Sequence, residues 1–251
     1  MTQQLKFILT REEAASKGVS RPSDLVKLEE EAMILARAPI SGVQDAVLGL
    51  ASSDRIFLGV NVEFEGLPLH HSISAEQFLV ANLALNFEQE LHACLIPSRF
   101  YLESFEEDVP LLLVPQNNRL AHSDPFSAAE ICSNPEHCSH LKCRALTAAN
   151  KSNAQYSKCP SGVALICEGE VYGGWCIESA AYNLSLGPVQ AALVDFMARG
   201  EGKGFEMITG AVLVEMNDAK VSQEATARIL LKTIAPGCNF SVFRCHKTAE
   251  N

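Results

Sequence analysis

The sequence predicts an α/β protein in which a β-hairpin followed by a helix occurs twice, after an N-terminal helical segment. Both copies read strand, short turn, strand, acidic residue, loop and helix, as AVLGLASSDRIFLGVNVEF and GVALICEGEVYGGWCIESA show. Glu63 and Glu178 hold matching places, and Gln77 and Gln190 follow in the two helices. Repetition of one supersecondary unit within a chain favours an internal duplication.

The chain divides into four segments. Residues 1–40 are the N-terminal helical segment, and residues 41–115 hold the first copy. Residues 116–138, rich in Asn, Ser, Asp and Pro, read as a linker before the second copy at 139–251. The first copy is truncated, because the residues after its helix show no clear strand–helix–strand pattern.

Periodicity and capping signals place the individual elements. We expect helices over residues 23–38, 75–86, 141–150, 188–199 and 223–234. We expect strands over residues 46–50, 55–61, 163–167, 171–177, 208–215 and 240–245. Residues 2–21 show no strong period and are expected to be loosely structured. The run VPLLLVP at 109–115 reads as an edge strand or as extended chain.

Composition excludes several classes of protein. A net charge of −10 without a Lys/Arg cluster argues against nucleic-acid partners. No apolar run reaches the roughly 18 residues that a membrane helix needs. Nine cysteines, an odd number, in a chain that starts without a secretory pattern indicate reduced thiols and a cytoplasmic location.

Several stretches resemble one family closely and in order. They read ARAPIS, GVNVEF, LPLHHSI, AEQFLV, ANKSNAQYSKCPSGVAL, ESAAYN and GPVQAALVDF. They resemble the homodimeric class of cytidine deaminases, and most of all its plant members. The resemblance implies tandem cytidine-deaminase-like α/β/α sandwich domains, the first of them catalytic. It also implies zinc-dependent hydrolytic deamination of cytidine or deoxycytidine, a pyrimidine-salvage reaction.

The resemblance assigns site residues in the first copy. Zinc deaminases hold Zn²⁺ with one His and two Cys, while a Glu that is not a ligand moves protons, in the signature H-x-E…P-C-x-x-C. Glu76 matches that proton-moving acid. Asn61, Val62 and Glu63 match the family's substrate-contacting strand end.

The zinc ligands depart from the family pattern. Ser74 stands where the family has its His ligand, and the chain contains no C-x-x-C. The segment after the helix resembles the family's inter-domain connection, so the block that bears both cysteines reads as deleted. Val43 stands where the family stacks an aromatic ring on the base. We therefore expect no metal, no cofactor and a catalytically inactive homologue that is not an enzyme.

Each site residue keeps two interpretations. Glu76 is either a residual general acid/base or a vestigial charge at a helix start. Asn61 and Glu63 either retain contact with a nucleoside or serve as strand-end hydrogen-bonding groups. His70 and His71 are either replacement ligands or solvated loop residues.

Two further stretches stay open in the same way. The run CSNPEHCSHLKC, from Cys132 to Cys143, is either a structural metal site or a loop with adventitious thiols. Residues 180–182, where the family's partner subunit leans over the active site, either contact a partner or pack at a domain seam.

The departures from the family's zinc-ligand pattern suggest alternative functions. The chain could form a homodimer, or it could form a heterodimer as a dimerisation or regulatory partner of an active paralogue. It could also be a protein that retains weak cytidine or deoxycytidine binding, or a decaying duplicate that folds poorly.

Overall fold

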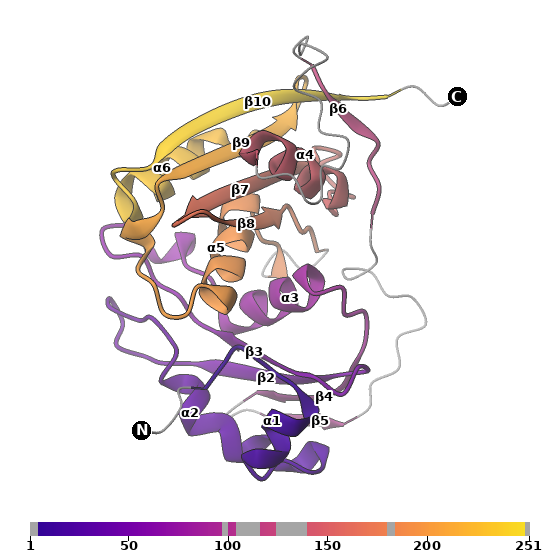
Figure 1. Cartoon of the computed structure of the whole chain (residues 1–251), viewed down its shortest axis with the longest axis vertical. Helices are drawn as coiled ribbons and strands as arrows, with labels where there is room; N and C mark the ends of the chain where they lie inside the picture. The colour runs from indigo at the N-terminus through magenta and orange to yellow at the C-terminus, as the bar shows by residue number, and fades with distance from the viewer. Residues whose placement is uncertain (1–4, 97–99, 104–115, 124–139, 180–183, 249–251) are drawn as a thin grey trace. The chain divides into compact units, whose positions relative to one another are not determined.

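The computed structural model describes residues 5–96, 100–103, 116–123, 140–179 and 184–248. The contacts group them into two compact units, Met1–Val114 (unit 1) and Pro115–Asn251 (unit 2). Each unit contains a five-stranded sheet with helices packed on it (Figure 1). Among the described residues, no helix combines the length and the apolar character needed to cross a membrane.

Unit 1 is an antiparallel sheet with strand order β1-β3-β2-β4-β5. Its strands are β1 (Ile8–Leu9), β2 (Ala46–Ala51), β3 (Ile56–Val60), β4 (Leu91–Ile96) and β5 (Phe100–Glu103). Its helices are α1 (Arg11–Ser16), α2 (Glu29–Met33) and α3 (Ala75–Leu85), with 3-10 helices at Pro22–Leu28 and Leu69–His71.

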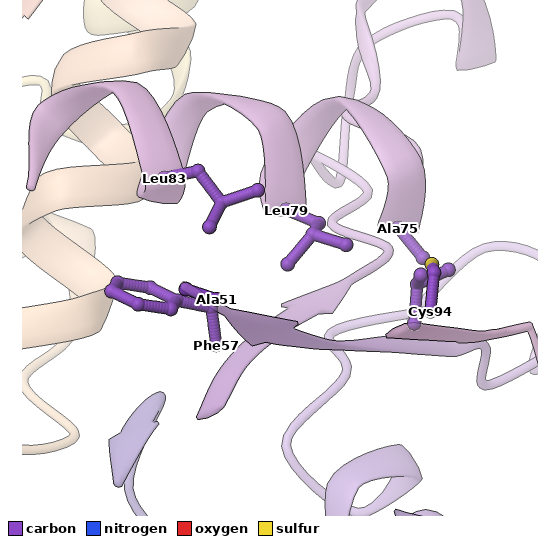
Figure 2. Close-up of a cluster of buried hydrophobic side chains, with 7 residues drawn as sticks. Ala51, Phe57, Ala75, Leu79, Leu83 and Cys94 are labelled. Atoms are coloured by element: carbon purple, nitrogen blue, oxygen red, sulfur yellow. The ribbon is translucent and has the colours of Figure 1, made fainter. Parts of the chain in front are cut away.

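Helix α3 packs directly on the hairpin of unit 1. Leu79 and Leu83 of the helix lie over Phe57 of β3, within one buried cluster (Figure 2). A Cβ added to Gly59 would lie 2.1 Å from the carbonyl oxygen of Ala75, so only glycine permits this close approach. The spacing sets the start of α3 against the end of β3.

Unit 2 is a mixed sheet with strand order β6-β10-β9-β7-β8, in which the β9–β10 pair is parallel and the other described pairs are antiparallel. Its strands are β6 (Leu120–His122), β7 (Ser161–Cys167), β8 (Glu170–Trp175), β9 (Gly210–Met216) and β10 (Asn239–Lys247). Its helices are α4 (Leu141–Lys151), α5 (Pro188–Arg199) and α6 (Glu224–Ile234), with a 3-10 helix at Phe205–Met207.

Two glycines show that α4 and α5 cover opposite faces of this sheet. A Cβ on Gly162 would meet the backbone of α4, and a Cβ on Gly174 would meet the backbone of α5. Gly162 pairs with Trp175, the neighbour of Gly174, so the two glycines point to opposite faces. Unit 2 is therefore the predicted α/β/α sandwich.

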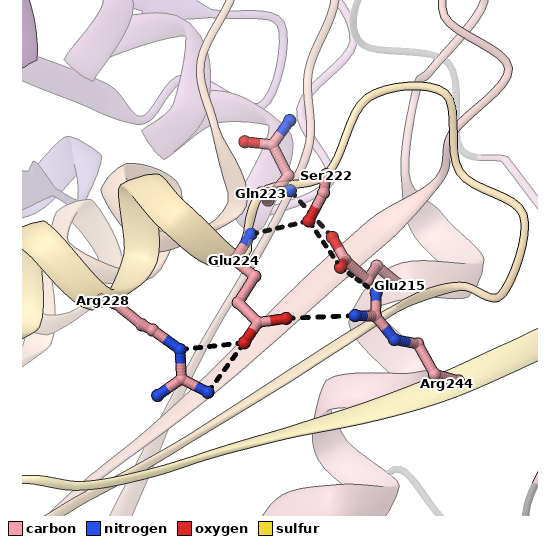
Figure 3. A network of polar contacts seen from close by, with 6 residues as sticks. All are labelled: Glu215, Ser222, Gln223, Glu224, Arg228 and Arg244. Atoms are coloured by element: carbon pink, nitrogen blue, oxygen red, sulfur yellow. Dashed lines mark hydrogen bonds and ion pairs between the residues drawn. The ribbon is translucent and has the colours of Figure 1, made fainter.

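An ion-pair network around one buried glutamate anchors the crossover from β9 through α6 to β10 (Figure 3). Glu215 of β9 is 1% exposed and accepts hydrogen bonds from the Gln223 N–H and the Ser222 hydroxyl, both at 2.8 Å. Arg244 of β10 pairs with Glu215 and, at 3.0 Å, with Glu224 at the start of α6. The buried carboxylate is thus compensated, as its position requires.

The structure confirms both predicted hairpins and the helices at residues 75–85, 141–151, 188–199 and 224–234. The expectation that residues 2–21 are loosely structured is wrong, because β1 pairs with β3 and α1 has a capping box at Thr10. The helix expected over residues 23–38 is a 3-10 helix followed by the short α2. Strand β6 lies inside the predicted linker, and the 109–115 run lies outside the described residues.

Candidate functional site

Backbone pairing brings the predicted site residues of unit 1 together. The N–H and C=O groups of Val62 exchange hydrogen bonds with those of Ile73, each at 2.9 Å. The N–H of Glu63 also donates to the carbonyl of Arg37 at 2.7 Å. These bonds fix the segment after β3 between residue 37 and the start of α3, which places Asn61 and Glu63 beside that helix start.

Glu63 is bound to residues far upstream in the sequence. Its Oε2 accepts hydrogen bonds from the N–H groups of Ile40 (2.8 Å) and Ser41 (2.9 Å), and its Oε1 accepts one from the Ser41 hydroxyl (2.5 Å). The hydroxyl bond first, and then the backbone bonds, lower the pKa of Glu63, because they favour the charged carboxylate. Glu63 is therefore held ionised against residues 40–45, here called the 40–45 loop.

Asn61 holds the other end of the same loop. Its Oδ1 accepts a hydrogen bond from the Asp45 N–H (2.9 Å), and its Nδ2 donates to the Val43 carbonyl (2.8 Å). Val62, between the two, is fully buried. Of the three residues expected at a nucleoside, the two polar ones thus direct their side chains to the loop.

Glu76 lies in the first turn of α3 and is half-buried. The N-terminal end of a helix favours an ionised carboxylate, because the backbone N–H dipoles point toward it. Unit 2 differs at this place: α5 starts at Gly187-Pro188-Val189, so Val189 matches Glu76. Only the helix start of unit 1 carries a carboxylate at this position.

Ser74 serves as the N-cap of α3. Its hydroxyl accepts a hydrogen bond from the Gln77 N–H (3.2 Å), and the Gln77 side chain accepts one from the Ser74 N–H (2.9 Å). This reciprocal capping box engages the residue that the resemblance predicts at the place of a histidine ligand.

The structure describes one thiol beside this helix start. Cys94 of β4 lies next to Ala75 (Figure 2). Burial first, and then the charge of Glu76, raises the pKa of the Cys94 thiol to about 11. Across the part of the chain that the structure describes, no three His, Cys, Asp or Glu side chains gather as a metal-binding group.

Other predicted residues are placed apart from this constellation or are not described. His70 and His71 lie in the 3-10 helix before α3, with their rings 4.3 Å apart. His140 is the N-cap residue of α4 and Cys143 lies within that helix, whereas residues 132–138 of the same run fall outside the described residues. Residues 180–182 fall outside them too.

A cleft of about 460 Å³ in unit 1 was not expected from the sequence. Its apolar lining includes Leu25, Leu50 and Ile56, and Arg11 and Arg21 are among its polar residues. Leu50 pairs with Ile56 on the face of the sheet opposite Phe57 and α3. None of the predicted site residues lines this cleft.

Comparison with known proteins identifies relatives along the whole chain. Residues 91–228 match the family described as the cytidine and deoxycytidylate deaminase zinc-binding region. Cytidine deaminase 6 of Arabidopsis thaliana is 53% identical over 296 residues, covering 98% of this chain and 100% of the relative. Cytidine deaminase 5 of the same plant is 49% identical, covering 100% of this chain and 86% of the relative.

A solved structure of cytidine deaminase from Burkholderia pseudomallei is also similar. It is 22% identical, with a TM-score of 0.32, and covers 41% of this chain and 87% of that chain.

The alignments also show a difference in length. The match to Cytidine deaminase 6 runs over 296 residues and this chain has 251, a difference of 45. Since 98% of this chain is aligned, the relative has residues without a counterpart here.

The comparisons correct one prediction. The expectation that this chain is not an enzyme is wrong, because relatives 53% and 49% identical over nearly its whole length are named cytidine deaminase. The missing C-x-x-C is a fact of the sequence, but it is not positive evidence of inactivity. With a family match over more than half its residues and relatives along its whole length, this chain belongs to the cytidine deaminase family.

Proposed function

We propose that this chain binds cytidine or deoxycytidine in unit 1, at the start of α3. The observation that carries the proposal is Glu76, which stands where unit 2 has Val189, beside the strand end that carries Asn61, Val62 and Glu63. The names of the relatives support the same class of ligand.

The reaction proposed for this site is hydrolytic deamination, in which water replaces the amino group on the base and ammonia leaves. Glu76 is the residue of this chain suited to carry a proton between the two, because a carboxylate at hydrogen-bonding distance from both groups can accept and return it. A metal, where the family holds one, supplies a hydroxide. We propose that no zinc is held at this helix start, and we derive no step from it.

One experiment tests the ligand and the role of Glu76 together. Purified protein is titrated with cytidine and deoxycytidine by calorimetry, assayed for ammonia and uridine, and analysed for bound metal. We expect nucleoside binding that weakens in Glu76→Gln, and any turnover should be lost in that variant. Glu206→Gln, an exposed carboxylate of unit 2, is the charge-matched control and should change neither quantity.

The possible results separate the parts of the proposal. A protein that binds neither nucleoside overturns the ligand, and equal binding by wild type and Glu76→Gln overturns the assignment of the carboxylate. One equivalent of zinc per chain would contradict the proposal that the helix start holds none.

We also propose that the chain forms a homodimer or a heterodimer with a paralogue, in the cytoplasm. Val43 of unit 1 and Tyr156 of unit 2 each leave an apolar side chain exposed, and a partner chain would cover such side chains. The seven described cysteines are free thiols, which suits a reducing compartment. Co-expression with a paralogue followed by size-exclusion chromatography should give mixed dimers, and strictly monomeric species would contradict this.

A further inference from the structure

The cleft of unit 1 lies on the face of the sheet opposite α3, between the sheet and the segment that contains α1 (Figure 1). We propose that this cleft binds a small amphipathic organic anion, with an apolar ring or chain and one negatively charged head. The inference does not rest on the proposed function, because none of the residues proposed to bind a nucleoside lines the cleft.

The apolar part of the cleft suits the body of such a ligand. Leu50 and Pro22 are half-buried and Ala15 is exposed, so all three offer accessible surface. Leu25 and Ile56 complete this part of the lining and are themselves buried. A volume of about 460 Å³ lies within the range of roughly 300–1,000 Å³ that is typical of small-molecule sites. A ring or chain that enters the cleft is therefore removed from water, which is favourable.

A β-bulge brings an imidazole to the same cleft. Leu50 pairs with Ala93 of β4, and the next pair of the ladder passes over His92 to Leu91. In a regular strand, His92 would share a face with Cys94, two residues further on. The bulge instead leaves Leu91 against the core under α3, while the exposed His92 lines the cleft. Bulges that redirect a side chain in this way are frequent next to functional sites.

Arg21 supplies the positive charge for the head of the ligand. Its side chain is 78% exposed, and its ion partner Asp24 lies 3.7 Å from Nε, beyond hydrogen-bonding distance. Asp24 is bound more closely by Lys27, at 2.9 Å, and by the Ser20 N–H, at 3.1 Å. A guanidinium carries five N–H donors in a planar arrangement that suits carboxylate and phosphate oxygens. An anion can therefore bind Arg21 without displacing a short hydrogen bond.

The remaining charges of the lining indicate a ligand with one negative charge. Arg11 pairs with Asp54 at 3.0 Å, and both residues line the cleft. Two arginines against one aspartate leave the described lining with one excess positive charge, in a chain whose net charge is −10. Because Arg11 already compensates Asp54, Arg21 is the residue that makes this cleft attractive to an anion.

The test uses two probes that differ only in charge. Anilinonaphthalene sulfonate has an aromatic body and one sulfonate, and N-phenylnaphthylamine is the same body without the sulfonate. Each is titrated into the full chain and followed by fluorescence. Hydrogen–deuterium exchange, with and without the sulfonate, locates the site.

Three variants separate the parts of the cleft. Arg21→Gln removes the positive charge, and Ala15→Trp fills the apolar part from an exposed position. Arg228→Gln, which changes a half-exposed arginine of unit 2, is the charge-matched control.

We expect Arg21→Gln to weaken binding of the sulfonate by about tenfold, because a charge-assisted hydrogen bond is lost, and to leave binding of the uncharged probe unchanged. Ala15→Trp should weaken the binding of both probes, and Arg228→Gln should weaken neither. The bound sulfonate should slow exchange at residues 11–25. Excess cytidine should leave the affinity for the sulfonate unchanged.

Each contrary result overturns a stated part of the inference. Absence of saturable sulfonate binding by the wild type overturns the site. Equal losses in Arg21→Gln and Arg228→Gln would show that the net charge of the chain acts, and not the cleft. Slowed exchange only outside residues 11–25 overturns the location, and displacement of the sulfonate by cytidine overturns the independence of the two sites.

Discussion

The outer strand of the hairpin is β3 in unit 1 and β8 in unit 2. Backbone groups of β1 and its neighbour Phe7 bind the edge of β3, whereas side chains of α5 bind the edge of β8. In unit 1 the N–H of Leu58 donates to the carbonyl of Phe7 at 2.9 Å, and β1 pairs with β3. In unit 2 the matching N–H, that of Gly173, donates to Asp195 of α5 at 2.8 Å. Arg199 of the same helix donates to the Val171 carbonyl at 3.0 Å. An exposed strand edge invites pairing with another chain, and each unit prevents this differently.

One helix position explains the difference. Asn82 of α3 and Asp195 of α5 each lie five residues after the matching glutamines, Gln77 and Gln190. The Asn82 amide donates to the carbonyls of Phe7 (3.3 Å) and Leu58 (3.2 Å), so it joins β1 to β3. Asp195 instead accepts from the Gly173 N–H, and none of the described strands pairs with that edge of β8. The edge of β3 presents carbonyl oxygens to α3, so a side-chain donor suits that position. The edge of β8 presents an N–H group to α5, so a side-chain acceptor suits that position.

The largest expected loss of stability comes from replacing the hydrogen-bond donor at residue 82 by an acceptor. Asn82→Asp would direct a buried carboxylate at two carbonyl oxygens, with the neutral Asn86 amide as its donor, and a buried charge without an ionic partner costs about 4 kcal/mol of unfolding free energy. Denaturant unfolding, with hydrogen exchange to locate the loss in unit 1, measures it. The loss should shrink in acid, where a protonated Asp regains a donor.

Asn82→Ala is the control for this exchange and should cost about 1–2 kcal/mol, because it removes the hydrogen bonds without adding charge. If Asn82→Asp proves no worse than Asn82→Ala, the donor at this position does not distinguish the two edges.

A smaller effect is expected from opening the edge of unit 2. Asp195→Ala leaves the Gly173 N–H without its side-chain acceptor and removes the partner of Arg199, 2.6 Å away. We expect a loss of about 1 kcal/mol in stability together with concentration-dependent association. Sedimentation velocity at several concentrations measures the association.

Glu170→Ala is the matched control. It changes an exposed residue of β8, the strand that contains Gly173, and should leave the oligomeric state unchanged. Association that is equal in both variants would show that Asp195 does not protect this edge.

The smallest effect concerns pH and the 40–45 loop. The pKa of Glu63 is lowered in the folded chain, so its contribution to stability is present above the ordinary carboxyl pKa of 4.5 and is lost as pH falls through the lowered value. The amide resonances of Ile40 and Ser41 should therefore shift together in acid, which NMR titration detects. In Glu63→Gln this shared transition should disappear, and its persistence would assign the titration to another group.

Much of the fold follows from local sequence patterns. Both hairpins and the helices α3, α4, α5 and α6 carry strong periodicity or capping signals, and they fold as expected. Strand β1 has only two residues and β6 only three, too few to show a period. Their pairing is decided by the open edges of β3 and β10, which lie far along the chain.

Some residues of the candidate site can also be predicted from local sequence patterns, and others cannot. Glu76 is recognisable from its place at a helix start, and Asn61 and Glu63 from their place at a strand end. Their partners, Ile40 and Ser41, lie more than 20 residues upstream and belong to no periodic element. A usable signal existed: a serine precedes each hairpin at the same spacing, Ser41 in ARAPIS and Ser157 in NAQYS.

The order in which partner strands emerge during synthesis differs between the units. Every described strand of unit 1 is complete by Glu103, and β4 turns back at once into β5. In unit 2, β6 pairs with β10, so His122 cannot form its strand pair until Cys245, 123 residues later, has been synthesised. Contacts between distant residues form slowly. A ribosome-bound chain could therefore close the sheet of unit 1 early, while β6 stays without its partner until translation is nearly finished.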